Sequence, residues 1–178
     1  MVLLAVQVNR NQGHNSKGDL MNSKDNDMQV LKIKWQRLVS DGRTCRRCEV
    51  TEEELDKAVI ALRQSLGSLN IQVSLEKVEL SIAEFDEDPL QSNQIWLNDQ
   101  LLEDWLGGKV NRSQCCDVCD PAECRVIEIG EETYEAIPAE LIIRAGLLAA
   151  SRMVIPETTG SCCDGETPEV TTTCCCQK

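Results

Sequence analysis

Cysteines are the residues of this sequence whose spacing points most directly to chemistry, and the chain has eleven of them. Two form a C-x-x-C motif at residues 45–48, and four more fall within residues 115–124. A thiolate is both a nucleophile and a ligand for soft metal ions. The two groups therefore predict either a redox-active dithiol or a metal site.

The surroundings of the C-x-x-C motif favour the thiolate form. Residues 32–47 contain six basic side chains and one acidic side chain, although the whole chain carries a net charge of -12. Arginines beside a thiol, and a helix N-terminus close to it, stabilise the thiolate. We therefore expect Arg43, Arg46 and Arg47 to stabilise the thiolates of Cys45 and Cys48.

The second group lies on a segment that also contains a proline, and four thiols within ten residues can converge on one ion. Two C-x-x-C pairs together suit tetrahedral sulfur ligation of zinc or an iron–sulfur centre. A zinc ion held there could also serve only to clamp the loop to the domain. The predicted core set is Cys45, Cys48, Cys116 and Cys119, with Cys115 and Cys124 assisting.

The remaining five cysteines lie close to the end of the sequence. Vicinal thiolates suit thiophilic ions such as arsenite, mercuric and cuprous ions. A tethered tail raises the thiol concentration at the domain to roughly millimolar, which would allow an ion to pass to or from the core site. The alternative is an unconstrained terminus without a role. The predicted tail ligands are Cys162, Cys163, Cys174, Cys175 and Cys176.

Composition excludes several other classes of function. The negative net charge argues against a protein that binds nucleic acid by neutralising phosphates. No apolar run approaches the roughly 20 residues that a membrane span needs, so we expect no membrane insertion. The single histidine, His14, lies in a polar leader, which removes histidine-dependent triads and common zinc hydrolase sites from the folded part. No signal peptide is predicted, so we expect a cytoplasmic protein in which thiols persist.

The sequence divides into three parts. Residues 1–27 are predicted to be a disordered leader or an upstream start, residues 28–154 a folded domain, and residues 155–178 a flexible cysteine-rich tail. Apolar alternation predicts strands at residues 31–35 and 71–75. A capping box at residues 51–54 predicts the start of a helix that ends at Gly67. A second capping box at residues 81–84 predicts a short helix.

The rest of the domain predicts a hairpin around Asn98-Asp99, a cysteine loop, a second hairpin around Gly130 and a helix that begins at Pro138. A strand–helix–strand unit followed by a hairpin and a closing helix is the layout of the α/β thioredoxin-like fold. The C-x-x-C motif falls between the first strand and the first helix, where that fold keeps its dithiol.

Four segments together resemble an uncharacterised prokaryotic family that is described as a domain of unknown function and placed among thioredoxin-like folds. They are LKIKWQRLVSDGRTCRRC, TEEELDKAVIALRQSL, SNQIWLNDQLLEDWLG and CCDVCDPAECRVIEIGEETYEAIPAELIIRAGLLAAS. The resemblance covers residues 28–153 and implies the fold and a prokaryotic source.

Two better-known thioredoxin-like groups share parts of the pattern. Thioredoxin-like ferredoxins with a 2Fe-2S cluster place two cysteines in the first strand–helix loop and two before a hairpin, and Cys45, Cys48, Cys116 and Cys119 are similarly distributed. Arsenite metallochaperones carry vicinal cysteines, as the tail does. Both are analogies of fold and ligand type.

Together these features predict thiol-based binding and transfer of a thiophilic metal or metalloid ion, such as arsenite or zinc. Two alternatives stay open. One is a thiol–disulfide oxidoreductase in which Cys45 and Cys48 are catalytic. Only under this hypothesis is the protein an enzyme. The other is an electron carrier with a 2Fe-2S cluster. The expected partners are the ion itself and a transporter or redox partner protein.

Overall fold

The strand β1 (Gln29–Leu38) lies inside a four-stranded sheet in the computed structural model, which describes residues 28–115, 119 and 121–154. Its period-two pattern buries Leu31, Ile33 and Trp35, as the alternation predicts. The predicted leader and the predicted tail lie outside the described residues.

The order of this sheet is β2-β1-β3-β4. The strand β2 (Ile71–Leu80) is parallel to β1 along its whole length, and a parallel pair needs a crossover, which α1 supplies. The strand β3 (Gln94–Leu97) runs antiparallel to β1, and β4 (Gln100–Leu101) runs antiparallel to β3. The turn between β3 and β4 uses positive φ angles at Asn98 and Asp99, as the predicted hairpin requires.

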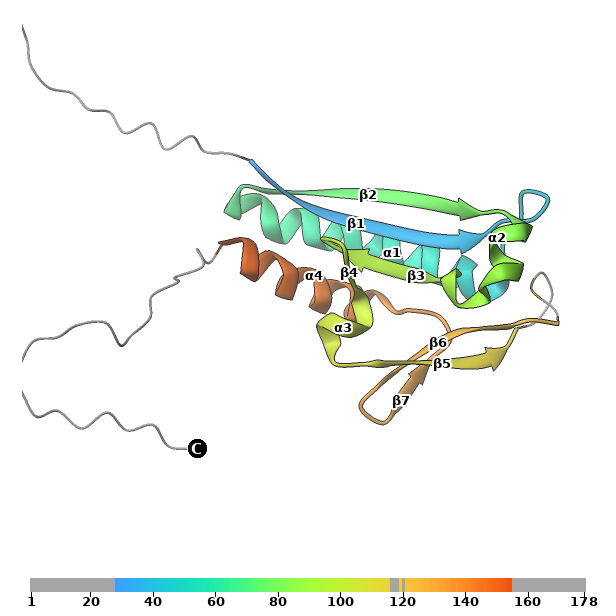
Figure 1. Ribbon diagram of the computed structural model, residues 1–178. Helices are drawn as coiled ribbons and strands as arrows, with labels where there is room; N and C mark the ends of the chain where they lie inside the picture. Colours follow the sequence, from blue (N-terminus) through green and yellow to red (C-terminus); the bar gives the residue numbers. More distant parts are fainter. Residues whose placement is uncertain (1–27, 116–118, 120, 155–178) are drawn as a thin grey trace, which may run out of the picture.

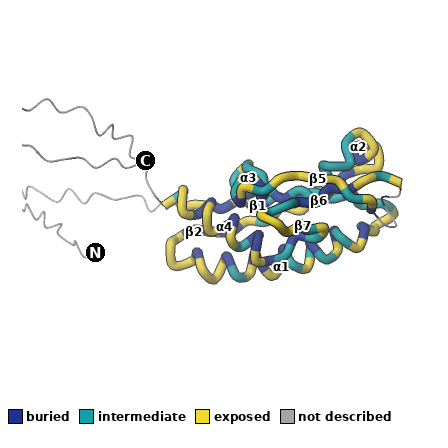
Figure 2. Tube along the Cα trace, turned by 90° about the horizontal axis from the view of Figure 1, so that it is seen from below, coloured by how far each residue is buried: buried dark blue, intermediate teal, exposed yellow. Residues whose placement is uncertain are grey.

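Two long helices lie side by side against the sheet (Figure 1). Buried and exposed segments alternate along α1, as expected for a helix with one face on the core (Figure 2). The helices are α1 (Arg46–Leu66), α2 (Ile82–Glu87), α3 (Leu102–Leu106) and α4 (Ala139–Val154), with 3₁₀ turns η1 (Gly67–Leu69) and η2 (Pro89–Gln91).

A second, antiparallel sheet of order β5-β6-β7 lies between α3 and α4 in the chain. It comprises β5 (Lys109–Gln114), β6 (Glu123–Ile129) and β7 (Glu132–Tyr134). The β6–β7 hairpin was predicted, whereas β5 was not, because its polar sequence KVNRSQ is exposed and shows no apolar alternation. The chain enters β5 through Gly108, where a Cβ would lie 2.8 Å from the carbonyl oxygen of Glu128.

The capping box predicted at residues 51–54 is wrong. Helix α1 begins six residues earlier, with Cys45 rather than Thr51 as its N-cap. The Thr51 hydroxyl instead donates to the carbonyl of Arg47 and accepts the backbone N–H of Ile137, and Glu54 accepts the N–H of Ala139. These polar side chains therefore satisfy amides at the start of α4. The capping box of Ser81 with Glu84 is confirmed.

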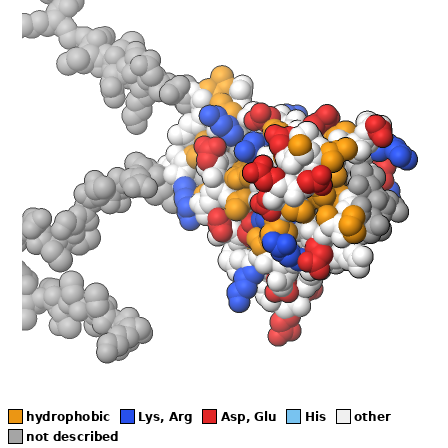
Figure 3. All heavy atoms as spheres, turned by 45° about the vertical axis from the view of Figure 1, so that its right-hand side comes forward, with side chains coloured by type: hydrophobic (Ala, Val, Ile, Leu, Met, Phe, Trp, Pro, Cys, Tyr) orange, Lys and Arg blue, Asp and Glu red, His pale blue; other side chains and the backbone are white. Residues whose placement is uncertain are grey.

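The α/β class is thus confirmed, and so is the layout of strand, helix, strand, hairpin and closing helix. The thioredoxin-like assignment stays a prediction with which this strand order agrees. None of the helices in the described ranges combines the length and apolar character that a membrane crossing requires. On the face in Figure 3, acidic and basic side chains are interspersed among apolar ones.

Candidate metal centre

The C-x-x-C motif lies at the start of α1. Cys45 is the N-cap residue, in extended conformation, and Cys48 lies in the first helical turn. Both side chains are buried, Cys45 at 3% and Cys48 at 2% exposure. The sulfur of Cys45 makes no capping hydrogen bond, but the nearby backbone N–H of Cys48 helps to lower the pKa of this thiol.

The second sheet supplies three further buried thiols. Cys115 directly follows β5, Cys119 lies in the connection to β6, and Cys124 belongs to β6. Backbone hydrogen bonds of Ala122 with both Cys115 and Cys119 close this connection on itself. None of the five described cysteines forms a disulfide with another of them.

The C-x-x-C motif and the cysteines of the second sheet lie close together. The sulfurs of Cys45, Cys115 and Cys119 all lie within 4.8 Å of one another. Tetrahedral zinc with bonds of about 2.3 Å holds its sulfurs about 3.8 Å apart, so closing on an ion requires each pair to approach by at most about 1 Å. This cluster of three cysteines could hold a metal ion. Cys48 contacts Cys45, and Cys124 hydrogen-bonds Cys119 and Cys115.

Hydrogen bonds among the thiols make their acidities unequal. Thiol donors on Cys119 and Cys48 hold the pKa of Cys45 far below its ordinary value despite burial. A hydrogen bond from Cys119 likewise lowers the pKa of Cys124. Donating to these thiolates raises the pKa of Cys119 and of Cys48, and burial raises that of Cys115. The cluster therefore alternates thiolate acceptors with thiol donors.

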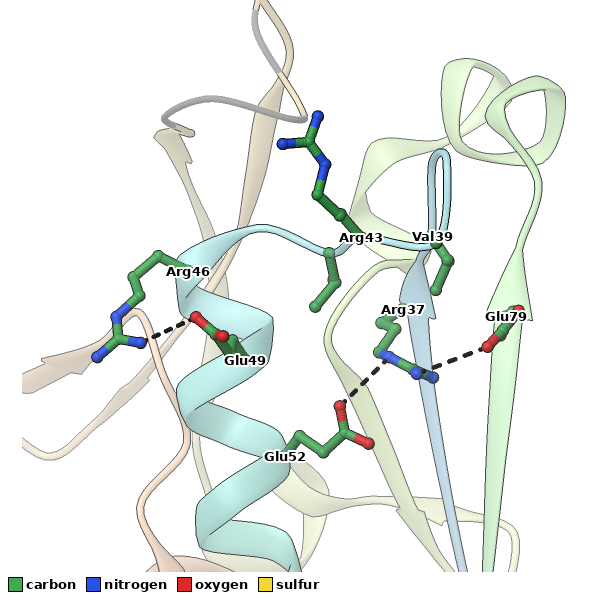
Figure 4. Close-up of a pocket in the computed structure, with 9 residues that line it drawn as sticks. Arg37, Val39, Arg43, Arg46, Glu49, Glu52 and Glu79 are labelled. Carbon is green, nitrogen blue, oxygen red and sulfur yellow. Dashed lines mark hydrogen bonds and ion pairs between the residues drawn. The ribbon is translucent and has the colours of Figure 1, made fainter.

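The three arginines predicted beside the dithiol have different surroundings. Arg47 reaches the segment that carries Cys115, where it hydrogen-bonds the carbonyl of Gln114. Arg46 is 66% exposed and forms an ion pair with Glu49. Arg43 and Arg46 line a cavity of about 820 Å³ between the start of α1 and the ends of β1 and β2 (Figure 4).

That cavity is separate from the sulfurs, since no cysteine is among the described residues that line it. Arg37 lies between Glu52 and Glu79, at 3.8 and 3.6 Å, and Arg46 meets Glu49 at 2.8 Å (Figure 4). Positive and negative side chains thus alternate around it.

The sequence did not predict a polar neighbour of Cys48 and a buried ion pair formed by the residue after Cys124. Ser92 lies with its hydroxyl 3.7 Å from the sulfur of Cys48. Arg125, next to Cys124, forms a buried ion pair with Glu103 and donates to the carbonyl of Leu90. Burial lowers the pKa of Arg125 to about 10. Adjacency to a cysteine was the one sequence signal for Arg125, whereas Ser92 and Glu103 gave none.

The structure therefore brings Cys45, Cys115 and Cys119 together, with Cys48 and Cys124 against them. Cys116, predicted as a core ligand, lies outside the described residues, and so do the five tail cysteines. Cys115, predicted only to assist, is one of the three clustered ligands.

Comparison with known proteins gives a family match and an archaeal relative. A family model described as "Domain of unknown function (DUF2703)" matches residues 31–146, which include all six cysteines of the first two groups. An uncharacterized protein of Archaeoglobus fulgidus is 46% identical over 112 residues, covering 63% of this chain and 82% of the relative. No solved structure matches the chain. The predicted resemblance to an uncharacterised prokaryotic family is confirmed.

Proposed function

We propose that this chain, which belongs to the DUF2703 family, uses its buried cysteines to bind a thiophilic metal or metalloid ion and to pass it on. The observation that carries the proposal is the approach of three sulfurs within 4.8 Å of one another. One comes from the start of α1 and two from the connection after β5. A thiol cluster assembled from distant segments suits a metal site, because each ligand is held by a different part of the fold.

Soft, sulfur-seeking ions are the substrates that this donor set favours. Thiolate ligands select zinc, cuprous ion and similar ions over magnesium or calcium. Trivalent arsenic fits three sulfurs directly: arsenous acid reacts with three thiols, each As–O bond is replaced by an As–S bond, and each hydroxyl group leaves as water with the proton of one thiol. Zinc would complete its tetrahedron with a further thiolate or a water molecule.

Transfer is proposed from the composition of the tail. Its five thiols would capture an ion from solution and deliver it to the core cluster by thiolate exchange, one sulfur at a time. A transporter or another thiol protein would receive the ion in the same way.

One observation favours a second candidate, a thiol–disulfide oxidoreductase. The lowered pKa of Cys45, with Cys48 one helical turn away, is the arrangement of an attacking and a resolving thiol. However, Cys45 is only 3% exposed, so a protein disulfide would reach it only after local opening. Reduction of insulin disulfides in the presence of a thioredoxin reductase would support this candidate.

The test is a titration of the reduced full chain in which the five tail cysteines are serines. We expect about one equivalent of arsenite or zinc to bind, and Cys45→Ser to weaken binding at least about 100-fold because it removes a ligand. The matched control is Cys48→Ser, which removes a thiol outside the group of three and should cost less than about tenfold in the affinity for arsenite, which takes three sulfurs. Binding by Cys45→Ser as tight as that of the parent protein would contradict the proposal.

A further inference from the structure

We infer that Arg47 is a positioning residue that sets the separation of the two halves of the cysteine cluster, and thereby its affinity for an ion. The affinity part of this inference rests on the proposed function, whereas the positioning part does not. Arg47 lies between Cys45 and Cys48 in the sequence, yet its guanidinium bonds to residues beside Cys115.

The contacts of this guanidinium converge on one short stretch of the second sheet. It donates to the carbonyl of Gln114 at 2.8 Å, to the carbonyl of Ser113 at 3.4 Å and to the hydroxyl of Ser113 at 3.3 Å. It also donates to the carboxylate of Glu135, after β7, at 2.8 Å. Because the Arg47 side chain is only 12% exposed, solvent screens these charged hydrogen bonds weakly.

Further hydrogen bonds fix both the backbone of Arg47 and the residues that its guanidinium contacts. The carbonyl of Arg47 accepts a hydrogen bond from buried Thr51, one turn further along α1. At the other end, the hydroxyl of Ser113 donates to Glu135, and Asn93 donates to the carbonyl of Glu135. A planar guanidinium with several fixed partners orients what it binds more strictly than a single ion pair does.

Position rather than charge distinguishes Arg47 from its neighbours. Arg46 also carries a positive charge next to Cys45, but it forms its ion pair with Glu49 on the same helix. Gln114 directly precedes Cys115, so one guanidinium joins the turn that carries Cys45 to the residue before a second ligand. Removing it leaves the two sulfur-bearing segments joined by the contacts of the thiols themselves and by the rest of the fold.

The first test measures affinity for zinc and arsenite in the full chain with the five tail cysteines changed to serine. Residues that orient metal ligands from outside the ligand set typically contribute 10- to 100-fold in affinity, so we expect Arg47→Ala to bind about 10- to 100-fold more weakly. Arg47→Lys keeps the positive charge but lacks the planar guanidinium with its several N–H donors, so its affinity for the ion should remain weakened. Full restoration by lysine, or parent-like affinity in Arg47→Ala, would overturn the inference.

The matched control is Arg63→Ala. Arg63 also joins α1 to a strand, through the carbonyl of Val73, but at the end of the helix away from the cysteines. Its loss should change affinity by less than about twofold. Glu135→Gln, at a side chain that is 53% exposed, is a mild second variant that keeps the fold and should show a smaller loss than Arg47→Ala. An equal loss in Arg63→Ala would show a general effect of stability and overturn the assignment.

A second readout needs no metal. In a Cys48→Ser background, diamide takes two electrons and two protons from a pair of thiols and leaves a disulfide, which peptide mapping identifies. We expect Arg47→Ala to lower the yield of bonds from Cys45 to Cys115 or Cys119, and Arg63→Ala to leave it unchanged. If the parent protein binds no ion but Arg47→Ala lowers this disulfide yield, the proposed function fails and the positioning role of Arg47 stands. An unchanged yield in Arg47→Ala overturns the positioning role.

Discussion

The residues of the cluster are not equivalent, because each thiol either donates or accepts. Interactions with the thiols of Cys119 and Cys48 lower the pKa of Cys45. Sharing its single S–H between Cys124 and Cys45 raises the pKa of Cys119. Burial raises the pKa of Cys115. Among the three clustered ligands, Cys45 is therefore the one whose surroundings favour the thiolate, and those of Cys115 and Cys119 favour the thiol.

This inequality predicts the number of protons that zinc displaces. A bound ion needs three thiolates, and Cys45 already is one, so binding should release about two protons, from Cys115 and Cys119. Lowering the pH increases proton competition at these two thiols, and affinity should fall about 100-fold per pH unit between about pH 8 and pH 6. Calorimetry in buffers of different ionisation enthalpy measures the release. Release of three protons would show that Cys45 is a thiol before binding.

At the scale of single elements, the start of α1 shows why local signals mislead. The sequence TEEE at residues 51–54 fits a capping box, but Arg46 to Val50 are helical too. The polar groups of Thr51 and Glu54 are used by the start of α4, more than 80 residues away in the sequence. Such a partner is set by tertiary packing and is invisible to a local pattern. By contrast, the Ser81 capping box is a local structure, and it was predicted correctly.

Packing between α1 and α4 gives a prediction for two glycines. A Cβ on Gly146 would lie 2.6 Å from Cδ1 of Leu62, so Gly146→Ala should push the helices apart and destabilise the protein by about 1–3 kcal/mol. Gly67→Ala is the control, because its Cβ would meet nothing within 4 Å and its φ is -58°. That variant should be neutral or more stable by up to about 1 kcal/mol. Urea unfolding measures both, and equal midpoints would contradict this account of the interface.

At the scale of the whole molecule, the candidate site lies where the two sheets meet. The first sheet and α1 contribute Cys45 and Cys48, and the second sheet with its connections contributes the other three described thiols. The bonds of Arg47 join the same two parts, and the buried pair of Arg125 with Glu103 joins β6 to α3. A bound ion would add one more link across this junction.

This arrangement explains how far the sequence could predict the site. The C-x-x-C motif, the layout of the elements and the class of ligand follow from local spacing, whereas the place of Cys48 inside the first turn of α1 does not. The place of Cys115 in the cluster does not either, because the direction of this side chain depends on the end of β5, a strand without an apolar period. The contacts of Arg47 and Glu103 depend on the same packing of the second sheet, so no sequence pattern indicated them.

The most direct measurement of the central claim is X-ray absorption spectroscopy of the arsenite- or zinc-loaded full chain with its five tail cysteines changed to serine. The account predicts a first shell that contains about three sulfurs, at about 2.3 Å for zinc. It also predicts that Cys45→Ser removes at least one of these sulfurs from any ion that remains bound. A shell made only of oxygen or nitrogen, or an unchanged sulfur shell in Cys45→Ser, would contradict it.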